Sequence, residues 1–162
     1  MAKRDLRRTL LSWLTVLSAP AWAQQDYIPD HERTPGAINP DITQETISTT
    51  VCASGYTKSI RPPSSYTSRL KARQMRELGL PGTLRDYHED HLVPLCVGGH
   101  PSDERNLWPE PVDGKWNATV KDQLESSVCR QVCRRDITLQ QGQAIFLAPD
   151  WTREYVRYFG LE

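Results

Sequence analysis

The residues best suited to chemistry lie in one short stretch, residues 87–111, with the sequence YHEDHLVPLCVGGHPSDERNLWPEP. It holds three of the four histidines of the chain, and Asp90 directly precedes His91. Histidine titrates near neutral pH and can act as a general base. Carboxylate and amide oxygens suit Mg²⁺, which keeps several waters and takes few protein ligands. A base that activates water beside a cation that holds a phosphate is the equipment for phosphodiester hydrolysis.

Asp90 and His91 can serve one site only where the backbone is irregular. In a regular strand, neighbouring side chains point to opposite faces, so the pair must lie where a strand ends or bulges. Pro94 and the Gly98-Gly99 pair follow closely and favour such an ending. Glu89 is then expected to point outward, away from the metal.

Three later residues complete the candidate site. Asn106 can accept a hydrogen bond from the His91 ring and fix its tautomer, and it can also be an ordinary Asx-turn residue. Asn117, placed in the first turn of a predicted helix, can supply a second metal oxygen beside Asp90. Lys121 lies one helical turn further on and is expected to contact a substrate phosphate.

A basic stretch precedes this site. Six Lys and Arg residues lie between residues 58 and 76, with Glu77 as the only nearby acid. They form either a solvated helix face or a surface that follows a phosphate backbone. Arg61 is the best single phosphate candidate because two prolines follow it and restrict its backbone. Arg69 and Arg73, one turn apart, are the next candidates.

The elements that must position these residues can be predicted from pattern and capping signals. Residues 50–63 are expected to form a short strand, and Ser64 or Ser65 to cap a helix over 66–78 that stops at Gly79. Residues 90–95 and 106–111 are predicted as short extended segments. A long helix starts near Lys115, with an apolar stripe at Val120, Leu124, Val128 and Val132. A capping box at Thr138 and Gln141 and a cap at Asp150 begin two further helices, and Trp151, Tyr155 and Phe159 are expected to close the core.

The N-terminus has the features of a secretory signal. Residues 1–23 combine a basic start, a short apolar run and the cleavage pattern AWA, although an uncleaved anchor is the alternative. Removing their four basic residues and one acid leaves 16 basic and 19 acidic residues, a net charge of −3. Nucleic-acid binding then requires a local basic patch. We expect residues 24–50 to be a polar, Pro-rich arm and residues 51–162 to form one domain, in a protein that is periplasmic or secreted without stable membrane association.

Four cysteines in an exported chain indicate two disulfides. Cys129 and Cys133 lie on one face of the predicted long helix, so each most naturally pairs with a distant partner. We favour Cys52–Cys133 and Cys96–Cys129, with a four-cysteine zinc site as the alternative.

The order and spacing of these residues resemble those of the ββα-metal nucleases, also called His-Me finger or HNH nucleases. The matching segments are EDHLVPLCVGG, SDERNLWPE and WNATVKDQLE, and the resemblance spans residues 88–125. The third motif position holds Asn117, giving an H-N-N form similar to the endonuclease I group. The resemblance implies that His91 is the general base, that Asn106 positions it, and that Asp90 and Asn117 bind the metal. The chain departs from that group in having Asp90 in place of glutamate.

These observations predict an α+β protein with a ββα-metal core, additional helices and two disulfides. The expected activity is hydrolysis of DNA, or also RNA, by an endonuclease that depends on Mg²⁺ or another divalent cation such as Mn²⁺ or Ca²⁺. Low sequence specificity is expected because no base-reading module is visible. Two alternatives remain open: a module that binds nucleic acid or a surface polymer without cutting it, and a structural protein stapled by disulfides or zinc.

Overall fold

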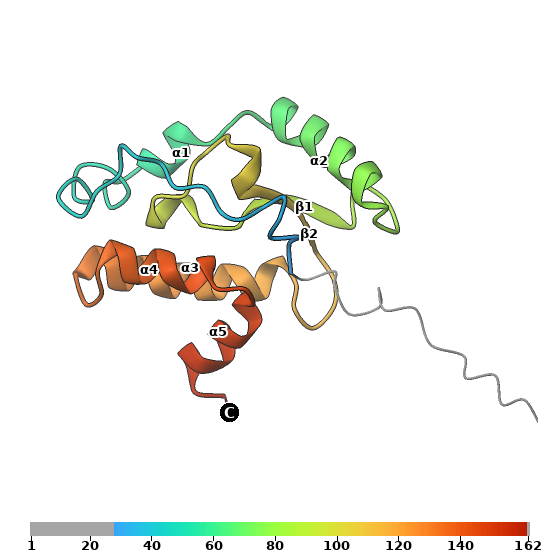
Figure 1. Cartoon of the computed structure of the whole chain (residues 1–162). Coiled ribbons are helices and arrows are strands. Elements are labelled where there is room, and N and C mark those ends of the chain that lie inside the picture. The colour runs from blue at the N-terminus through green and yellow to red at the C-terminus, as the bar shows by residue number, and fades with distance from the viewer. Residues whose placement is uncertain (1–27, 162) are drawn as a thin grey trace, which may run out of the picture.

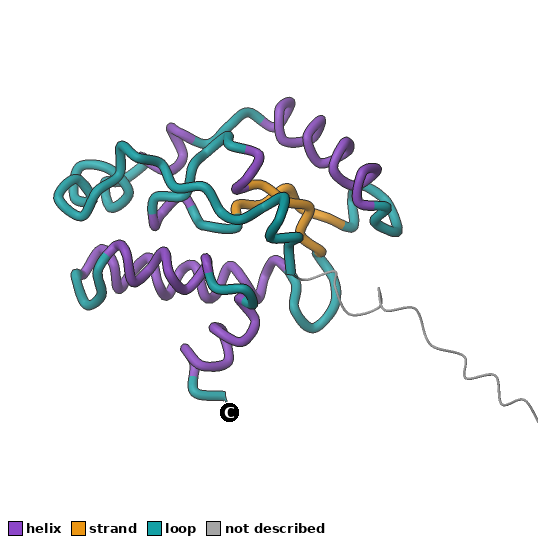
Figure 2. The backbone as a smooth tube through the Cα atoms, viewed as in Figure 1, coloured by secondary structure: helices purple, strands orange, loops and turns teal. Residues whose placement is uncertain are grey.

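The computed structural model describes residues 28–161 and shows an α+β fold with one small sheet (Figure 1). Helix α2 lies on one side of a two-stranded hairpin, and helices α3 and α4 lie on the other, with α5 beyond them. Figure 2 shows how much of the remaining chain is loop. The elements are α1 (Tyr56–Ile60), α2 (Ser64–Leu78), β1 (Tyr87–His91), η2 (Leu95–Val97), η3 (Glu104–Asn106), β2 (Leu107–Pro111), α3 (Ala118–Arg134), α4 (Leu139–Leu147) and α5 (Trp151–Phe159).

The hairpin pairs β1 with β2 in antiparallel register, with Asp90 opposite Trp108 and His91 opposite Leu107. The expected order of strand, loop, strand and helix is therefore present. The first strand ends at His91, whereas the sequence predicted an extended segment over residues 90–95. The strand stops early because Pro94 has no N–H to donate and the chain then turns through η2.

Two glycines make this turn possible. Gly98 has φ of +81°, in the left-handed region that favours glycine. Glycine is required at position 99 for a different reason, because a Cβ atom there would lie 1.8 Å from the carbonyl oxygen of Val93. The loop between the strands can therefore fold back tightly only with glycine at both positions.

Helix α3 organises the core. Leu124, Val128 and Val132 are fully buried along one side of it, and Phe146 of α4 and Trp151 of α5 pack into the same cluster. The predicted capping box of Thr138 and Gln141 and the predicted cap at Asp150 are both present. Of the expected C-terminal aromatic residues, Trp151 is buried and Tyr155 is partly buried. Phe159 is 38% exposed, so it does not close the core.

The N-terminal part of the described chain differs from the prediction. Residues 50–63 form turns and the short helix α1 rather than a strand, because Gly55 adopts a left-handed conformation immediately before the helix. Helix α2 begins at Ser64 itself after Pro63, so no serine side chain caps it. Residues 28–50 are not a separate surface arm, since Ile42 and Ile47 are buried in the core. The predicted signal segment, residues 1–23, lies outside the described residues.

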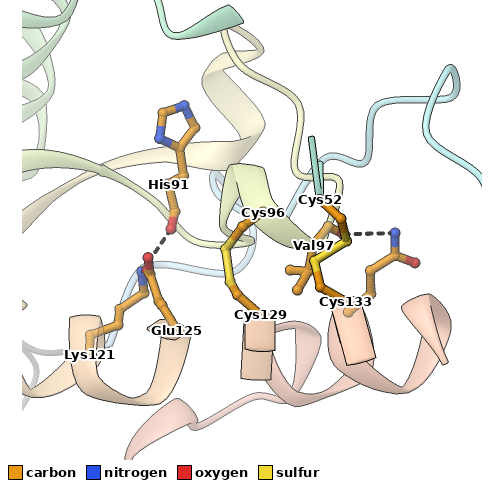
Figure 3. The surroundings of a disulfide bond; sticks show 9 residues. Cys52, His91, Cys96, Val97, Lys121, Glu125, Cys129 and Cys133 are labelled. Carbon is orange, nitrogen blue, oxygen red and sulfur yellow. Dashed lines mark hydrogen bonds and ion pairs between the residues drawn. A yellow bond between two sulfur atoms is a disulfide. The ribbon is translucent and has the colours of Figure 1, made fainter. Parts of the chain in front are cut away.

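Two disulfides fasten the loops to α3. Cys52 is bonded to Cys133 and Cys96 to Cys129, which confirms the favoured pairing. Figure 3 shows both bonds ending on neighbouring turns of α3. Each bond links segments far apart in the chain and so restricts the unfolded state. Across the described range, no helix is long and apolar enough to cross a membrane.

Candidate functional site

His91 lies at the last position of β1 and is only 3% exposed. Its Nε2 atom is 2.9 Å from the carbonyl oxygen of Pro101. A carbonyl oxygen can only accept, so Nε2 carries the proton and Nδ1 keeps a lone pair. Burial lowers the pKa of His91, although the Pro101 carbonyl and Asp90 oppose this effect. The ring is therefore neutral near pH 7, with Nδ1 able to accept a proton.

The sequence predicted that Asn106 accepts a hydrogen bond from the His91 ring, but the Asn106 side chain binds other groups. Its side chain is fully buried, accepts a hydrogen bond from the Val93 N–H and donates to the carbonyls of Val93 and His100. Both amide hydrogens are therefore used to fold the loop between the strands. Asn106 positions His91 only indirectly, because this loop carries the Pro101 carbonyl that binds the ring.

Lys121 of α3 lies against strand β1, on the side of the hairpin opposite the His91 ring. Its ammonium donates to Asp90 Oδ2 at 2.6 Å, to the His91 carbonyl oxygen at 2.8 Å and to Glu125. Figure 3 shows the His91 ring pointing away from Lys121 while the His91 backbone oxygen points toward it. The side chain of Lys121 is 0% exposed. The prediction that Lys121 contacts a substrate phosphate is therefore wrong, because the hairpin covers its charge.

Three carboxyl groups share this single ammonium, and we refer to Asp90, Glu110, Lys121 and Glu125 as the Lys121 cluster. Burial disfavours the charged form of Asp90, but Lys121 outweighs burial and keeps the Asp90 pKa below its usual value. Burial raises the pKa of Glu125 to about 7 and raises that of Glu110 well above normal. Glu110 is 1% exposed, and its Oε1 atom has no hydrogen-bond partner. The cluster therefore carries more acid than its one cation can balance.

Asn117 is the N-cap of α3 and lies one residue before the helix, not within its first turn. Its Oδ1 accepts from the Val120 N–H, and its Nδ2 donates to the Gly114 carbonyl. Both ends of this amide thus have local structural partners.

The expected divalent cation does not fit this donor set. The ammonium of Lys121 already lies against Asp90, and Asn117 uses its oxygen to cap α3. Across residues 28–161, no three His, Cys, Asp or Glu side chains are grouped so that they could hold a metal ion. Mg²⁺ would require open carboxylate or amide oxygens in octahedral positions. The oxygens expected to bind the metal are therefore already engaged by protein groups.

The three candidate arginines lie in different surroundings. Arg61 is exposed at the end of α1, and its charge contributes to lowering the His91 pKa. Arg69 is exposed on α2 and forms no ion pair with any described residue. Arg73 is paired with Glu104 and lies 3.7 Å from Glu77. Of the three, only Arg61 is linked electrostatically to His91, while Arg73 is already neutralised by carboxylates.

The opposite face of β1 holds a carboxyl group that the sequence analysis placed outward. Both oxygens of Glu89 are buried and lack hydrogen-bond partners. Burial raises the pKa of Glu89 to about 8, although Lys71 acts against this shift. Lys71 donates instead to the backbone carbonyls of Leu84 and Tyr87, at 2.6 and 2.5 Å. Glu89 is therefore protonated near neutral pH.

The tryptophans near the site are structural. Trp108 is 4% exposed, so it presents no face for base stacking. Trp116 packs edge-on against Trp151, with ring centroids 5.9 Å apart, and also against Tyr155. This agrees with the more common role of tryptophan in a core.

Sequence reasoning missed the Pro101 carbonyl and the roles of Glu110 and Glu125. A signal existed for Glu125, because it lies four residues after Lys121 on the predicted helix. No family model, curated protein or solved structure matches the chain.

Proposed function

We propose that this chain is an exported endonuclease whose core resembles that of the ββα-metal nucleases and that it hydrolyses phosphodiester bonds of DNA or RNA with low sequence specificity. The observation that supports this proposal best is the His91 ring. It lies at the end of the first strand of a strand, loop, strand and helix unit, and the Pro101 carbonyl fixes its tautomer. The two disulfides fit an exported protein.

In the proposed reaction, Nδ1 of His91 takes a proton from a water molecule as the water attacks phosphorus. The P–O bond to the departing sugar oxygen breaks, that oxygen takes a proton from solvent, and the imidazolium later returns its proton to solvent. The Nε2–H stays bound to the Pro101 carbonyl, which stabilises the imidazolium that forms. The negative charge of Asp90 acts in the same direction. The exposed guanidinium of Arg61 neutralises the phosphate. The neutral ground state of His91 is the form that this step requires.

A second candidate is a module that binds nucleic acid without cleaving it. The specific observation in its favour is the 3% exposure of His91, which restricts access of water and phosphate to the ring. In this alternative His91 has only a structural role, and the exposed basic residues of α1 and α2 bind the nucleic acid.

Plasmid cleavage separates the two candidates. The mature, oxidised protein is incubated with supercoiled DNA and with RNA, and nicking is measured over time. We expect His91→Ala to lower the rate about 100-fold or more, because general base catalysis typically contributes that much. His31→Ala is the matched control, since His31 lies in the N-terminal segment and takes no part in the proposed site. Cleavage at an equal rate by both variants would contradict the mechanism, and binding without any cleavage would favour the second candidate.

A further inference from the structure

We infer that the ammonium of Lys121 takes the position beside Asp90 that a divalent cation would otherwise fill, so the site is built to work without a metal there. The catalytic part of this inference rests on the proposed nuclease function. The binding part does not, because it concerns only whether Asp90 accepts a metal ion.

The hydrogen bonds of Lys121 support this assignment. An ammonium has three hydrogens to donate, and Lys121 has three acceptors in Asp90 Oδ2, the His91 carbonyl and Glu125. The side chain of Lys121 is fully buried, so the ammonium has no contact with bulk solvent. Lys121 thus provides a positive charge with a complete set of oxygen partners, as a bound cation would. It also ties the end of β1, where His91 lies, to α3.

The charge of the surroundings leads to the same conclusion. Without Lys121, the carboxyl groups of Asp90, Glu110 and Glu125 would face a space that contained no positive charge. Glu110 Oε1 is already buried without a partner in the native arrangement. Carboxylate oxygens of this kind are the ligands that Ca²⁺, Mn²⁺ and Mg²⁺ accept. The position that the ammonium leaves would be bordered by two carboxylates, Asp90 and Glu125, and by the His91 backbone carbonyl. Removing the ammonium should therefore create a metal site that uses this backbone oxygen, in a part of the chain where no three acidic or His side chains are grouped for a metal.

Thermal unfolding with and without metal tests this expectation. The mature, oxidised wild type and Lys121→Met are melted in EDTA and in millimolar MnCl₂ or CaCl₂. We expect the wild type to melt at the same temperature in both conditions. Lys121→Met should melt lower in EDTA and gain about 5–10 °C with metal, the shift produced by a ligand at about a hundred times its Kd.

Lys71→Met is the matched control, because Lys71 also binds β1 but donates only to backbone carbonyls. Its melting temperature should not respond to metal. If Lys121→Met does not fold, Lys121→Met/Glu125→Gln removes one positive and one negative charge together and keeps Asp90 and Glu110. The double variant should also gain stability with metal.

Two results would overturn the inference. One is stabilisation of the wild type by metal that Asp90→Asn abolishes, and the other is a folded Lys121 variant without any metal response. Plasmid cleavage gives a separate test: cleavage that continues in EDTA supports a metal-free site, whereas cleavage that EDTA stops contradicts it. Absence of cleavage in every condition counts against the proposed nuclease alone, because the melting experiment still decides the metal question.

Discussion

A lysine side chain binds strand β1 from each side, but the two lysines have different hydrogen-bond acceptors. Lys121 of α3 donates to Asp90, to Glu125 and to one backbone carbonyl. Lys71 of α2 donates to two backbone carbonyls and to no carboxylate. As a result the pKa of Asp90 lies below its usual value and Asp90 is charged. The preceding residue, Glu89, lies on the opposite face and has a pKa of about 8.

This difference shows that burial alone does not decide whether an acid is ionised. Burial raises the pKa of both carboxyl groups, but only Asp90 has a cation within hydrogen-bond distance that reverses the shift. The α3 side therefore holds an ionised Asp90 paired with Lys121, whereas the α2 side holds a protonated Glu89 that has no hydrogen-bond partner. A site that needs fixed charge beside His91 is more naturally built on the α3 side.

The largest expected effect comes from removing the lysine on each side in turn. Lys121→Ala should lower the free energy of unfolding by about 3–5 kcal/mol, because it leaves buried carboxylates without a partner. Lys71→Ala should lower it by about 1–2 kcal/mol, since water can replace a lysine at the partly exposed carbonyls. Urea unfolding at pH 7 measures both. Equal losses would show that the two faces do not differ as described.

The disulfides provide the second test, since both of them end on α3 and neither touches α2. Replacing Cys96 and Cys129 together by serine should lower the free energy of unfolding by about 2–5 kcal/mol. The equivalent change at Cys52 and Cys133 should lower it by about 0.8 kcal/mol more, because that bond spans 81 residues rather than 33. Urea unfolding of the two double variants measures the difference. An equal or reversed order would show that loop length does not control the stabilisation.

Much of the α3 side could be predicted from sequence because its signals are local. The apolar period at Leu124, Val128 and Val132 specifies the buried side of the helix. The spacing of Cys129 and Cys133 then places both disulfides on one face. Caps at Thr138 and Asp150 depend on residues at most three positions away, so they too were predictable.

The site itself depends on contacts that no local pattern contains. Asn106 binds the backbone of Val93, thirteen residues away, and His91 is fixed by a carbonyl, which every residue possesses. Lys121 was expected to contact a substrate phosphate because it carries a positive charge and lies one helical turn after Asn117. Its position, three residues before Leu124 and seven before Val128, nevertheless places it on the buried stripe. The helical period was therefore a better guide to Lys121 than the residue type.

A third prediction uses pH to separate the two acids of β1. The pKa of Glu89 is higher in the folded state, so its contribution to stability is full below about pH 4.5 and is lost as pH rises through about 8. Glu89→Gln should therefore stabilise the protein at pH 9 relative to wild type, by about 2–4 kcal/mol. Urea unfolding at pH 5 and pH 9 measures this change.

Asp90→Asn is the matched comparison and should show the opposite sign. The folded-state pKa of Asp90 is lowered, so its contribution is present above the unfolded pKa and is lost as pH falls. The variant should accordingly be less stable than wild type at neutral pH, and the difference should shrink in acid. A Glu89→Gln effect that does not change between pH 5 and pH 9 would mean that Glu89 is ionised throughout.

The smallest expected effect concerns nucleic-acid binding by α2 and rests on the proposed function. Arg69 has no ion pair with any residue in the described range, whereas Arg73 is paired with Glu104 and Glu77. An unpaired arginine can neutralise a phosphate and release a counterion, but a paired one must first lose its carboxylates. Arg69→Ala should therefore weaken binding of a DNA duplex a few-fold and reduce the slope of log K against log salt by about 1, as measured by fluorescence anisotropy. Arg73→Ala should change that slope less, and a larger change for Arg73 would place the phosphate path along the Glu104 side of the helix.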